Sequence, residues 1–127
     1  MNDVTLTPAF QLVANPEEIA HFLQAFQTQK DEAGLVFYPR EKNRRALLAL
    51  EISARDRERV IGQLRPEDYY KGPHDDGVLA GQQYWEFGKQ VNSREVYIKL
   101  SLGREGCAVF CYSFHLAARK IIYPYQS

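Results

Sequence analysis

One stretch of the sequence decides the fold, Arg94-Glu-Val-Tyr-Ile-Lys-Leu-Ser-Leu-Gly-Arg-Glu-Gly-Cys-Ala-Val-Phe-Cys-Tyr-Ser-Phe-His115, because it has the pattern of a β-hairpin. From Val96 to Leu102 apolar residues alternate with polar ones, which is the period of a strand with one buried face. Gly103 and Gly106 enclose a short turn, where glycine adopts positive φ at little cost. The segment from Cys107 to Phe114 is apolar on both faces, so we expect a central strand that is covered on both sides.

Length and composition indicate one globular domain. The chain has 127 residues, of which 45% are hydrophobic and 25% are charged, and a chain of this kind buries a core of its own. We therefore expect a single domain over residues 1–127. No apolar run approaches the length of about 18 residues that a membrane span needs, so no membrane contact is expected. The N-terminus has no basic patch followed by an apolar core, so we predict no signal peptide and a cytoplasmic location.

Charge is balanced over the whole chain but unevenly distributed. Residues 1–32 carry five acids and one lysine, residues 33–88 carry nine charges of each sign, and residues 89–127 carry six bases and two acids. A polyanionic ligand is therefore expected near the C-terminal hairpin rather than near the N-terminal segment. The balance excludes a uniformly basic nucleic-acid-binding protein.

The first half of the chain begins with a clear helix signal. Asn15-Pro16-Glu17-Glu18 supplies the N-cap, the proline and the first-turn acids of a helix that we expect to run to about Glu32. Residues 35–38 predict a short strand, and residues 40–45 a basic turn. The apolar residues 46–50 fit a helix and a strand paired with 35–38 equally well.

The second half adds a further helix and more strands. Ser53, with Asp56 three residues later, resembles a capping box at a helix start. Pro66 can start a short helical turn. His74 is expected in a loop, where contact with a substrate is the less favoured interpretation. Residues 82–87 predict a strand in which alternate side chains face opposite sides.

This order of elements predicts an α+β fold. A helix, one or two short strands and a second helix precede three or four strands that follow one another closely in the sequence. We therefore expect a small antiparallel sheet with the N-terminal helices packed on one face.

Four short segments carry titratable and aromatic side chains that neighbouring strands can bring together: 69–71, 84–86, 97–99 and 113–115. No glycine-rich phosphate loop, nucleophile elbow or zinc signature is present, so we predict no cofactor and no metal. Such groups suit RNA cleavage by the ribose 2′-hydroxyl, which needs a base, a cation at the phosphate and an acid for the leaving oxygen. Aromatic residues of an antiparallel sheet more often belong to the core, so the pattern alone leaves both interpretations open.

The two cysteines, Cys107 and Cys111, lie four positions apart in the predicted strand. At that spacing they are roughly 13 Å apart in an extended chain, whereas a disulfide needs Cα atoms within about 7 Å. We therefore predict two buried free thiols. A metal site is not expected, because no second pair of ligands accompanies them.

Five segments recur, in order, in a known family: Val60-Ile-Gly-Gln-Leu64, Asp68-Tyr-Tyr-Lys71, Tyr84-Trp-Glu86, Val96-Tyr-Ile-Lys99 and Val109-Phe-Cys-Tyr-Ser-Phe114. With them the region from about Ser53 to Phe114 resembles the MqsR (motility quorum-sensing regulator) family of toxins, which belong to the RelE/ParE-like ribonucleases. The family pattern is Val-Ile-x-x-Leu, Asp-Phe-Tyr-Lys, Trp-Gln, Val-Tyr-Leu-Lys and Val-Ser-Phe-Lys. The resemblance implies a RelE-like fold and a metal-independent endoribonuclease (an mRNA interferase) that is the toxin of a type II toxin–antitoxin system.

The resemblance also implies partners and site residues. Messenger RNA is the expected substrate, a cognate antitoxin the expected protein partner, and the ribosome a further candidate partner. Lys71 and Tyr97 match residues of the family pattern, whereas Glu86 stands in place of its glutamine and His115 in place of its terminal lysine. These four are the expected catalytic residues, and histidine is a competent acid or base near neutral pH. The expected RNA-binding residues are Tyr70, Tyr84, Trp85, Arg94 and Lys99.

Two interpretations of function follow from the sequence. In the first, Glu86 or His115 takes the 2′-hydroxyl proton, Lys71 holds the scissile phosphate, and His115 or Tyr97 serves the leaving group. In the second, the chain is a non-catalytic binding module that uses the same aromatic sheet to hold a protein or RNA partner. Lys99 fits a solvated strand lysine as well as an RNA contact.

Overall fold

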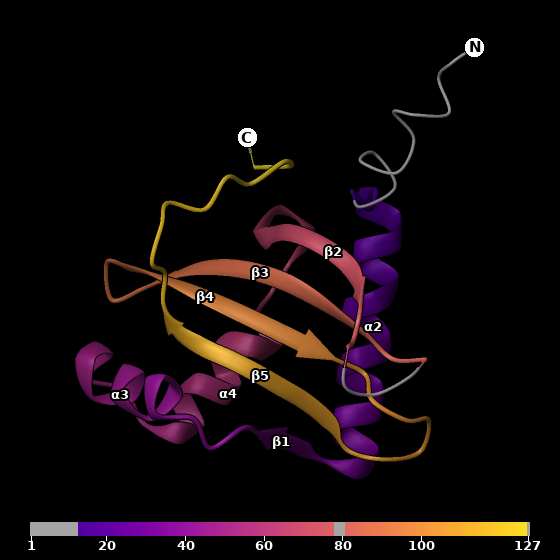
Figure 1. The fold of residues 1–127 in the computed structure, drawn as a ribbon, viewed down its shortest axis with the longest axis horizontal. Coiled ribbons are helices and arrows are strands. Elements are labelled where there is room, and N and C mark those ends of the chain that lie inside the picture. The colour runs from indigo at the N-terminus through magenta and orange to yellow at the C-terminus, as the bar shows by residue number, and fades with distance from the viewer. Residues whose placement is uncertain (1–12, 78–80, 127) are drawn as a thin grey trace.

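The computed structural model describes residues 13–77 and 81–126. Within these residues the helices are α2 (Pro16–Ala33), α3 (Glu41–Leu50) and α4 (Ala54–Gly62), followed by a 3-10 turn η2 (Pro66–Asp68). The strands are β1 (Leu35–Phe37), β2 (Tyr69–Asp75), β3 (Gln83–Val91), β4 (Arg94–Ser101) and β5 (Val109–Leu116). They form one five-stranded sheet in the order β1-β5-β4-β3-β2 (Figure 1). The α+β prediction is confirmed.

The predicted hairpin is the centre of this sheet. β4 and β5 pair antiparallel, with Tyr97 opposite His115, and β5 lies between β4 and β1 as a strand covered on both sides. The expectation of a purely antiparallel sheet is wrong, because β1 runs parallel to β5 with Leu35 opposite Val109. The chain enters β1 directly after α2 ends at Gly34, whose φ of 99° lies in the region that favours glycine. The sheet is therefore mixed.

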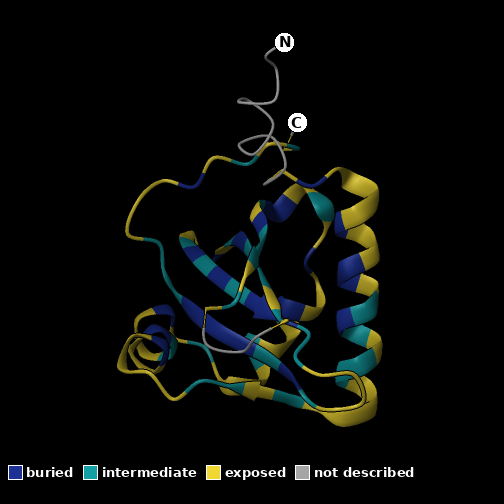
Figure 2. Cartoon of the chain, turned by 45° about the vertical axis from the view of Figure 1, so that its right-hand side comes forward, coloured by how far each residue is buried: buried dark blue, intermediate teal, exposed yellow. Residues whose placement is uncertain are grey.

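Helix α2 packs lengthwise against the sheet. Its start is the predicted one, with the Asn15 side chain accepting from the Glu18 amide and the Glu18 side chain accepting from the Asn15 amide. Phe22, in its buried stripe, stacks on Trp85 of β3 with ring centroids 4.6 Å apart. Figure 2 shows this stripe turned toward the sheet and the opposite side of the helix exposed. The face of the sheet that carries Trp85 is therefore the core face.

Helices α3 and α4 add to the same core. Residues 46–50, for which helix and strand were equally favoured, form the second half of α3, and the basic residues 40–45 form most of its first half rather than a turn. Ala46 and Leu50 are buried, as is Ile61 of α4. The predicted capping box between Ser53 and Asp56 is present at the start of α4.

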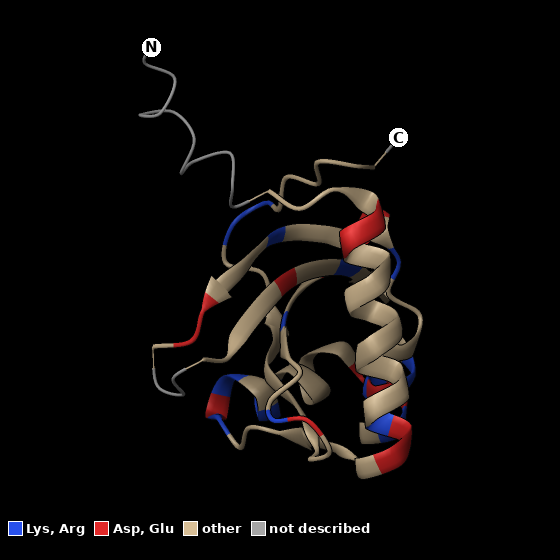
Figure 3. Ribbon diagram, turned by 90° about the vertical axis from the view of Figure 1, so that its right-hand side faces the viewer, with Lys and Arg blue, Asp and Glu red and all other residues tan. Residues whose placement is uncertain are grey.

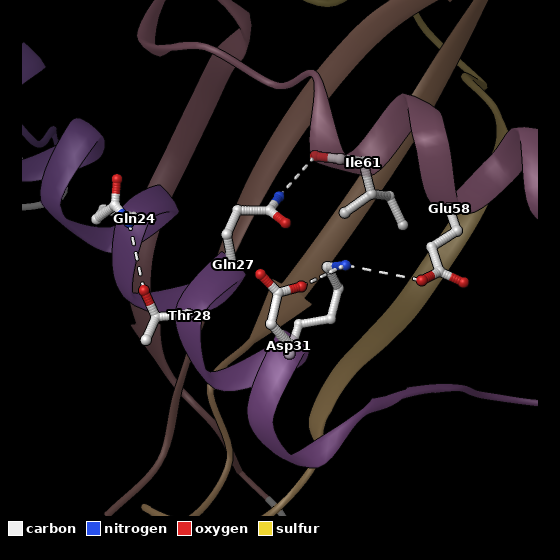
Figure 4. A network of polar contacts seen from close by, with 7 residues as sticks. Gln24, Gln27, Thr28, Asp31, Glu58 and Ile61 are labelled. Carbon is white, nitrogen blue, oxygen red and sulfur yellow. Dashed lines mark hydrogen bonds and ion pairs between the residues drawn. The ribbon is translucent and has the colours of Figure 1, made fainter.

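Polar side chains join α2 to α4 at the surface (Figure 4). The Gln27 amide donates to the Ile61 carbonyl oxygen at 3.3 Å, and Lys30 lies 3.7 Å from Glu58. Figure 4 also shows Gln24 and Thr28 joined within α2, one turn apart. The Ile61 carbonyl, in the last turn of α4, also accepts from the Leu64 amide at 3.3 Å, so Gln27 is its second donor.

Asn43 of α3 extends the sheet with its side chain. β1 pairs with β5 only as far as Cys111. Beyond this point the Asn43 amide donates to the Tyr112 carbonyl oxygen at 3.1 Å and accepts from the Phe114 amide at 3.0 Å. Asn43 is 2% exposed, so it supplies buried edge groups of β5 with the partners that a longer β1 would give.

One predicted loop is part of a strand, and two strand boundaries differ from the predicted ones. The segment around His74 is the end of β2 rather than a loop, and it pairs with β3, His74 lying opposite Tyr84. β3 continues to Val91, beyond the predicted end at Phe87. Conversely, β5 begins at Val109, so Cys107 lies outside the strand and is exposed; the prediction of two buried thiols holds for Cys111 alone.

After β5 the chain forms a C-terminal tail, residues 117–126, without helix or strand. In Figure 1 this tail turns back past the ends of β4 and β3. Among the described residues, no helix combines the length and the hydropathy needed to cross a lipid bilayer.

Candidate active site

The face of the sheet opposite the core, here called the outer face, carries four polar side chains in a row. Because side chains alternate along a strand, Trp85 and Ile98 point to the core while Glu86 and Tyr97 point to the outer face. His115 of β5, Tyr97 of β4, Glu86 of β3 and His74 of β2 follow one another across four adjacent strands. We call these four residues the polar row.

Short contacts link the members of the polar row. The Tyr97 hydroxyl donates to Glu86 Oε1 at 2.7 Å, and His74 Nε2 lies 2.7 Å from Glu86 Oε2. This second contact is an ion-pair contact rather than a well-directed hydrogen bond, and the buried Nε2 has no directed hydrogen bond to another described group. The His115 ring lies 5.4 Å from the Tyr97 ring.

Tyr97 reaches Glu86 diagonally across the β3–β4 ladder. Tyr97 lies directly opposite Gly88, and Glu86 is one outer-face position further along β3. Such diagonal pairs lie within the range of a long aromatic side chain. The hydrogen bond between the two side chains therefore fits the register of the strands.

Two irregularities in β2 bring its residues to this site. The pairing with β3 shifts once between Tyr69 and Lys71 and again between Lys71 and His74. Tyr69 is buried in the core. Tyr70, the next residue, lines a cavity on the outer face that is described below, and His74 contacts Glu86. Bulges of this kind redirect side chains and recur beside active sites.

Burial and neighbouring charges keep His115 neutral. Burial lowers the pKa of His115, the hydrogen bond with the Leu116 carbonyl raises it, and the positive charges of Lys42 and Arg40 lower it. His115 Nδ1 lies 3.1 Å from the Leu116 carbonyl oxygen, which can only accept, so Nδ1 carries the proton. The lone pair of the neutral ring is then on Nε2, which suits a general base.

Tyr97 is held in its protonated form. Burial raises the pKa of Tyr97, and the hydrogen bond to Glu86 and the negative charge of this carboxylate raise it further. Its phenol therefore donates and does not act as a base near neutral pH. The Glu86 side chain is 14% exposed and accepts from Tyr97 while it contacts His74.

Two cavities open along the outer face. One of about 300 Å³ contains three members of the polar row and is bordered by the C-terminal tail; its lining is Tyr70, Glu86, Tyr97, His115, Ala117, Ala118, Arg119 and Ile121. We call it the His115 cavity. The other, of about 370 Å³, has three tyrosines and two cations in its wall; its lining is Tyr38, Arg40, Asp75, Asp76, Gly77, Tyr84, Lys99 and Tyr112. We call it the tyrosine cavity.

Lys99 lines the tyrosine cavity and contacts aromatic rings there, so it is more than a solvated strand lysine. Its ammonium lies 4.0 Å from the centre of the Tyr84 ring and 5.9 Å from that of Tyr112. The Tyr112 hydroxyl donates to Asp76 at 2.8 Å, and burial and this carboxylate raise its pKa. Lys99 lies directly opposite Glu86 in the β3–β4 ladder, so the tyrosine cavity adjoins the polar row.

The structure brings together most of the predicted site residues. Glu86, Tyr97 and His115 share the His115 cavity with Tyr70. Lys71 lies opposite Glu86 in the β2–β3 ladder, and its exposed ammonium is 4.9 Å from the centre of the Tyr70 ring.

One predicted RNA-binding residue is wrong. Trp85 is 8% exposed and stacked on Phe22 in the core, so it cannot stack on a base. This correction follows from the alternation of side chains along a strand. Arg94 is exposed at the start of β4 and lines neither cavity, so its contact with RNA stays a prediction.

Sequence reasoning missed His74, Tyr112 and Tyr38 as site residues. His74 was expected in a loop, and no local signal reveals the contact with Glu86, because two bulges create it. Tyr112 follows Cys111 in an apolar run, where the pattern gives no hint of a polar partner.

The described residues contain no group of three or more His, Cys, Asp or Glu side chains arranged to hold a metal ion. The fold and the site together define a small α+β domain with a linked acid–base row on the outer face of its sheet. Comparison of the chain with known protein families, with curated proteins and with solved structures finds no match.

Proposed function

We propose that this protein is a metal-independent endoribonuclease of RelE-like fold, the toxin of a type II toxin–antitoxin pair, which cleaves messenger RNA by attack of a ribose 2′-hydroxyl. The observation that carries the proposal is the polar row. A neutral imidazole, a phenol, a carboxylate and a second imidazole from four adjacent strands meet at one face, and three of them share a cavity of about 300 Å³. This reaction class needs such acid–base groups at close range.

His115 is the base of the proposed reaction. Its neutral ring has the Nε2 lone pair available, because Nδ1 is engaged by the Leu116 carbonyl. Nε2 takes the proton of the 2′-hydroxyl as the 2′-oxygen forms a bond to phosphorus. The alternative base, Glu86, is less suited because its carboxylate already accepts from Tyr97 and contacts His74.

The remaining groups serve the phosphate and the leaving oxygen. Lys71, whose ammonium lies at the Tyr70 ring on the border of the cavity, supplies a cation for the negative charge that builds on the phosphorane. The bond from phosphorus to the 5′-oxygen then breaks, and the departing oxygen takes a proton, directly or through water, from the hydroxyl of Tyr97, which recovers one from the solvent. The products are a 2′,3′-cyclic phosphate and a free 5′-hydroxyl.

The tyrosine cavity gives the substrate a second point of attachment. Tyr84 and Tyr112 supply aromatic rings, and Lys99 and Arg40 supply positive charge. Single-stranded RNA is bound in this way by many proteins, through stacking of unpaired bases and cations along the backbone. Tyr84 and Lys99 are thus the principal RNA-binding residues of the proposal.

Product chemistry tests the proposed reaction. Purified protein incubated with single-stranded RNA in EDTA should yield fragments that end in a 2′,3′-cyclic phosphate, and RNA with 2′-deoxy nucleotides should stay intact. The double variant His115→Ala, Lys71→Ala should lose cleavage, whereas the control His21→Ala, Lys120→Ala, altered at exposed positions, should keep it. Unimpaired cleavage by the first variant would remove the site assignment.

A second candidate function is a non-catalytic binding module. Figure 3 shows acidic residues at both ends of α2 with uncharged residues between them, a surface suited to a protein partner with basic residues. Expression in a bacterial host separates the two functions. Growth arrest that His115→Ala relieves supports the toxin, and co-expression of a cognate antitoxin should relieve it as well. Harmless expression of the unaltered protein supports the binding module.

A further inference from the structure

Hydrogen bonds hold the C-terminal tail against the rest of the protein, and two of them go to the carboxylate of Glu95. Glu95 of β4 accepts from the Ile121 amide at 3.0 Å and from the Tyr123 hydroxyl at 2.9 Å. Its own backbone carbonyl accepts from the Ala117 amide at 3.0 Å. Further along, the Tyr125 hydroxyl donates to the Ala14 carbonyl oxygen at 2.6 Å. A segment without helix or strand is therefore held at four points.

Gly88 leaves the space that the tail fills. A Cβ atom at this position would lie 2.5 Å from the Tyr123 hydroxyl and 2.6 Å from Ile121 Cδ1. Ile121 is 4% exposed, so its side chain is buried between the tail and the sheet. Gly88 thus leaves room for the path of the tail.

The C-terminal tail forms one wall of the His115 cavity. Four tail residues line it, and among them Arg119 carries a guanidinium group. Arg119 is exposed and makes no ion pair with any described residue. The other lining residues with charge or protons to exchange are Glu86, Tyr97 and His115, together with Tyr70.

A phosphate in this cavity needs a cation. The Glu86 carboxylate repels a phosphodiester, and the pKa shifts of His115 and Tyr97 leave both groups uncharged. The ammonium of Lys71 lies over the Tyr70 ring, outside the lining of the cavity. Guanidinium groups bind phosphate oxygens in pairs, with two parallel hydrogen bonds.

We propose that Arg119 binds the scissile phosphate and that the C-terminal tail holds Arg119 in position. Glu95 fixes the tail through hydrogen bonds, and Gly88 leaves the space in which the tail packs. The inference rests on the proposed ribonuclease function and adds to it a cation that the family resemblance does not supply. Lys71 then shares the charge of the phosphorane with Arg119.

Two readouts test Arg119. The first is the single-turnover cleavage rate of a short RNA, and the second is the affinity for a 2′-O-methyl oligonucleotide that cannot be cleaved. Arg119→Ala should lower the rate about 10²-fold, the loss typical of one oxyanion-stabilising group, and weaken the affinity about tenfold. Arg119→Lys should restore part of both. The matched control Lys120→Ala, a charge removed from the next residue, should change either by less than about twofold.

The role of the tail is tested by Gly88→Ala. The added Cβ displaces Tyr123 and Ile121, so this variant should lose as much cleavage rate and RNA affinity as Arg119→Ala does. The double variant Gly88→Ala, Arg119→Ala should lose no more than either single variant. Circular dichroism shows whether Gly88→Ala folds; if it does not, Tyr123→Phe, which removes one bond to Glu95, takes its place and should show a smaller loss of rate.

The outcomes separate the two proposals. Equal rates and affinities of Arg119→Ala and Lys120→Ala overturn the role of Arg119 and leave the ribonuclease function standing. An unaltered protein that binds the oligonucleotide without cleaving RNA overturns the ribonuclease function, and the affinities then decide whether Arg119 holds a phosphate. A protein that neither binds nor cleaves overturns both.

Discussion

Tyr97 donates a 2.7 Å hydrogen bond to Glu86 from the neighbouring strand, diagonally across the β3–β4 ladder. This bond has two consequences. It fixes one oxygen of the Glu86 carboxylate. Because the other oxygen of this carboxylate lies 2.7 Å from His74, the bond links side chains of three neighbouring strands. It also keeps the phenol protonated, because burial and the carboxylate both raise the pKa of Tyr97. The polar row is therefore one coupled unit rather than four separate side chains.

A double-mutant cycle measures this coupling. Tyr97→Phe removes the donor and leaves half-buried Glu86 with one partner fewer, so it should lower the free energy of unfolding by about 1–3 kcal/mol. Glu86→Gln keeps an acceptor but removes the charge. In the double variant the losses should not add, and the coupling free energy from urea unfolding should be about 1 kcal/mol. Additive losses would show that the two side chains do not interact.

The pH dependence of cleavage should report the neutral state of His115. Burial lowers the pKa of His115 below its usual value near 6.5, so the base stays unprotonated down to a more acidic pH. The rate should be constant from neutral pH down to the usual histidine range and fall below it, where the ring takes up a proton. The profile of kcat/KM against pH for the unaltered protein checks this, and a fall that begins above pH 7 would contradict it.

The charge of Lys42 supplies a control for this profile. Its positive charge on α3 contributes to the lowered pKa of His115, and it makes no ion pair with a described residue. Lys42→Ala should raise this pKa and move the acid limb toward neutral pH. Arg59→Ala removes a charge from α4 instead and should leave the limb in place.

How far the fold could be predicted depends on the range of the interactions that make each element. Helix α2 and the hairpin β4–β5 follow from local signals: the cap at Asn15, alternation from Val96, and the glycine-flanked turn. β2 and α3 do not. The sequence around His74 indicates a loop, yet pairing with β3 makes the segment a strand, and tertiary contacts decide between helix and strand for residues 46–50.

The same distinction explains the site. Glu86, Tyr97 and His115 lie at outer-face positions that the strand pattern already assigns, so they could be expected to meet. Alternation also argues against Trp85, which lies in a segment that the family resemblance favoured. His74 and Arg119 reach the site through bulges and through a tail without regular structure, for which the sequence has no periodic signal.

The neighbours Tyr84 and Trp85 should have opposite effects. Tyr84 lies on the outer face beside Lys99, so Tyr84→Ala should weaken RNA binding by about 1–3 kcal/mol and change stability little. Trp85→Ala should instead lower the free energy of unfolding by about 3–5 kcal/mol, because it leaves a cavity against Phe22. Fluorescence anisotropy of a labelled oligonucleotide and unfolding followed by circular dichroism measure the two effects. Equal loss of RNA affinity in folded samples of both variants would contradict the assignment of faces.

The two cysteines should differ in reactivity. Cys107 is exposed, whereas burial raises the pKa of Cys111 to about 12, so its reactive thiolate is scarce at pH 8. A thiol reagent in excess should modify one cysteine of the native protein and two in urea. Cys107→Ser should abolish the native reaction and keep one thiol in urea. Two rapid modifications of the native protein would show that the core around Cys111 is open.

Asn43 should matter to stability more than any exposed residue of α3. Asn43→Ala leaves the Tyr112 carbonyl and the Phe114 amide of β5 without their side-chain partners, at about 1–3 kcal/mol for each buried group. Arg44→Ala, at the next position on the exposed side of α3, should change stability by less than about 0.5 kcal/mol.

Asn43→Asp distinguishes loss of the amide from loss of packing. Aspartate keeps the shape and the acceptor for the Phe114 amide, but it places a negative charge against the Tyr112 and Tyr38 carbonyl oxygens that the amide now satisfies. It should therefore destabilise the protein at neutral pH and less so when acid protonates the carboxyl group. Urea unfolding followed by fluorescence of Trp85, the single tryptophan, measures all three variants. If Asn43→Asp is as stable as the unaltered protein at pH 7, the side chain does not extend the sheet at β5.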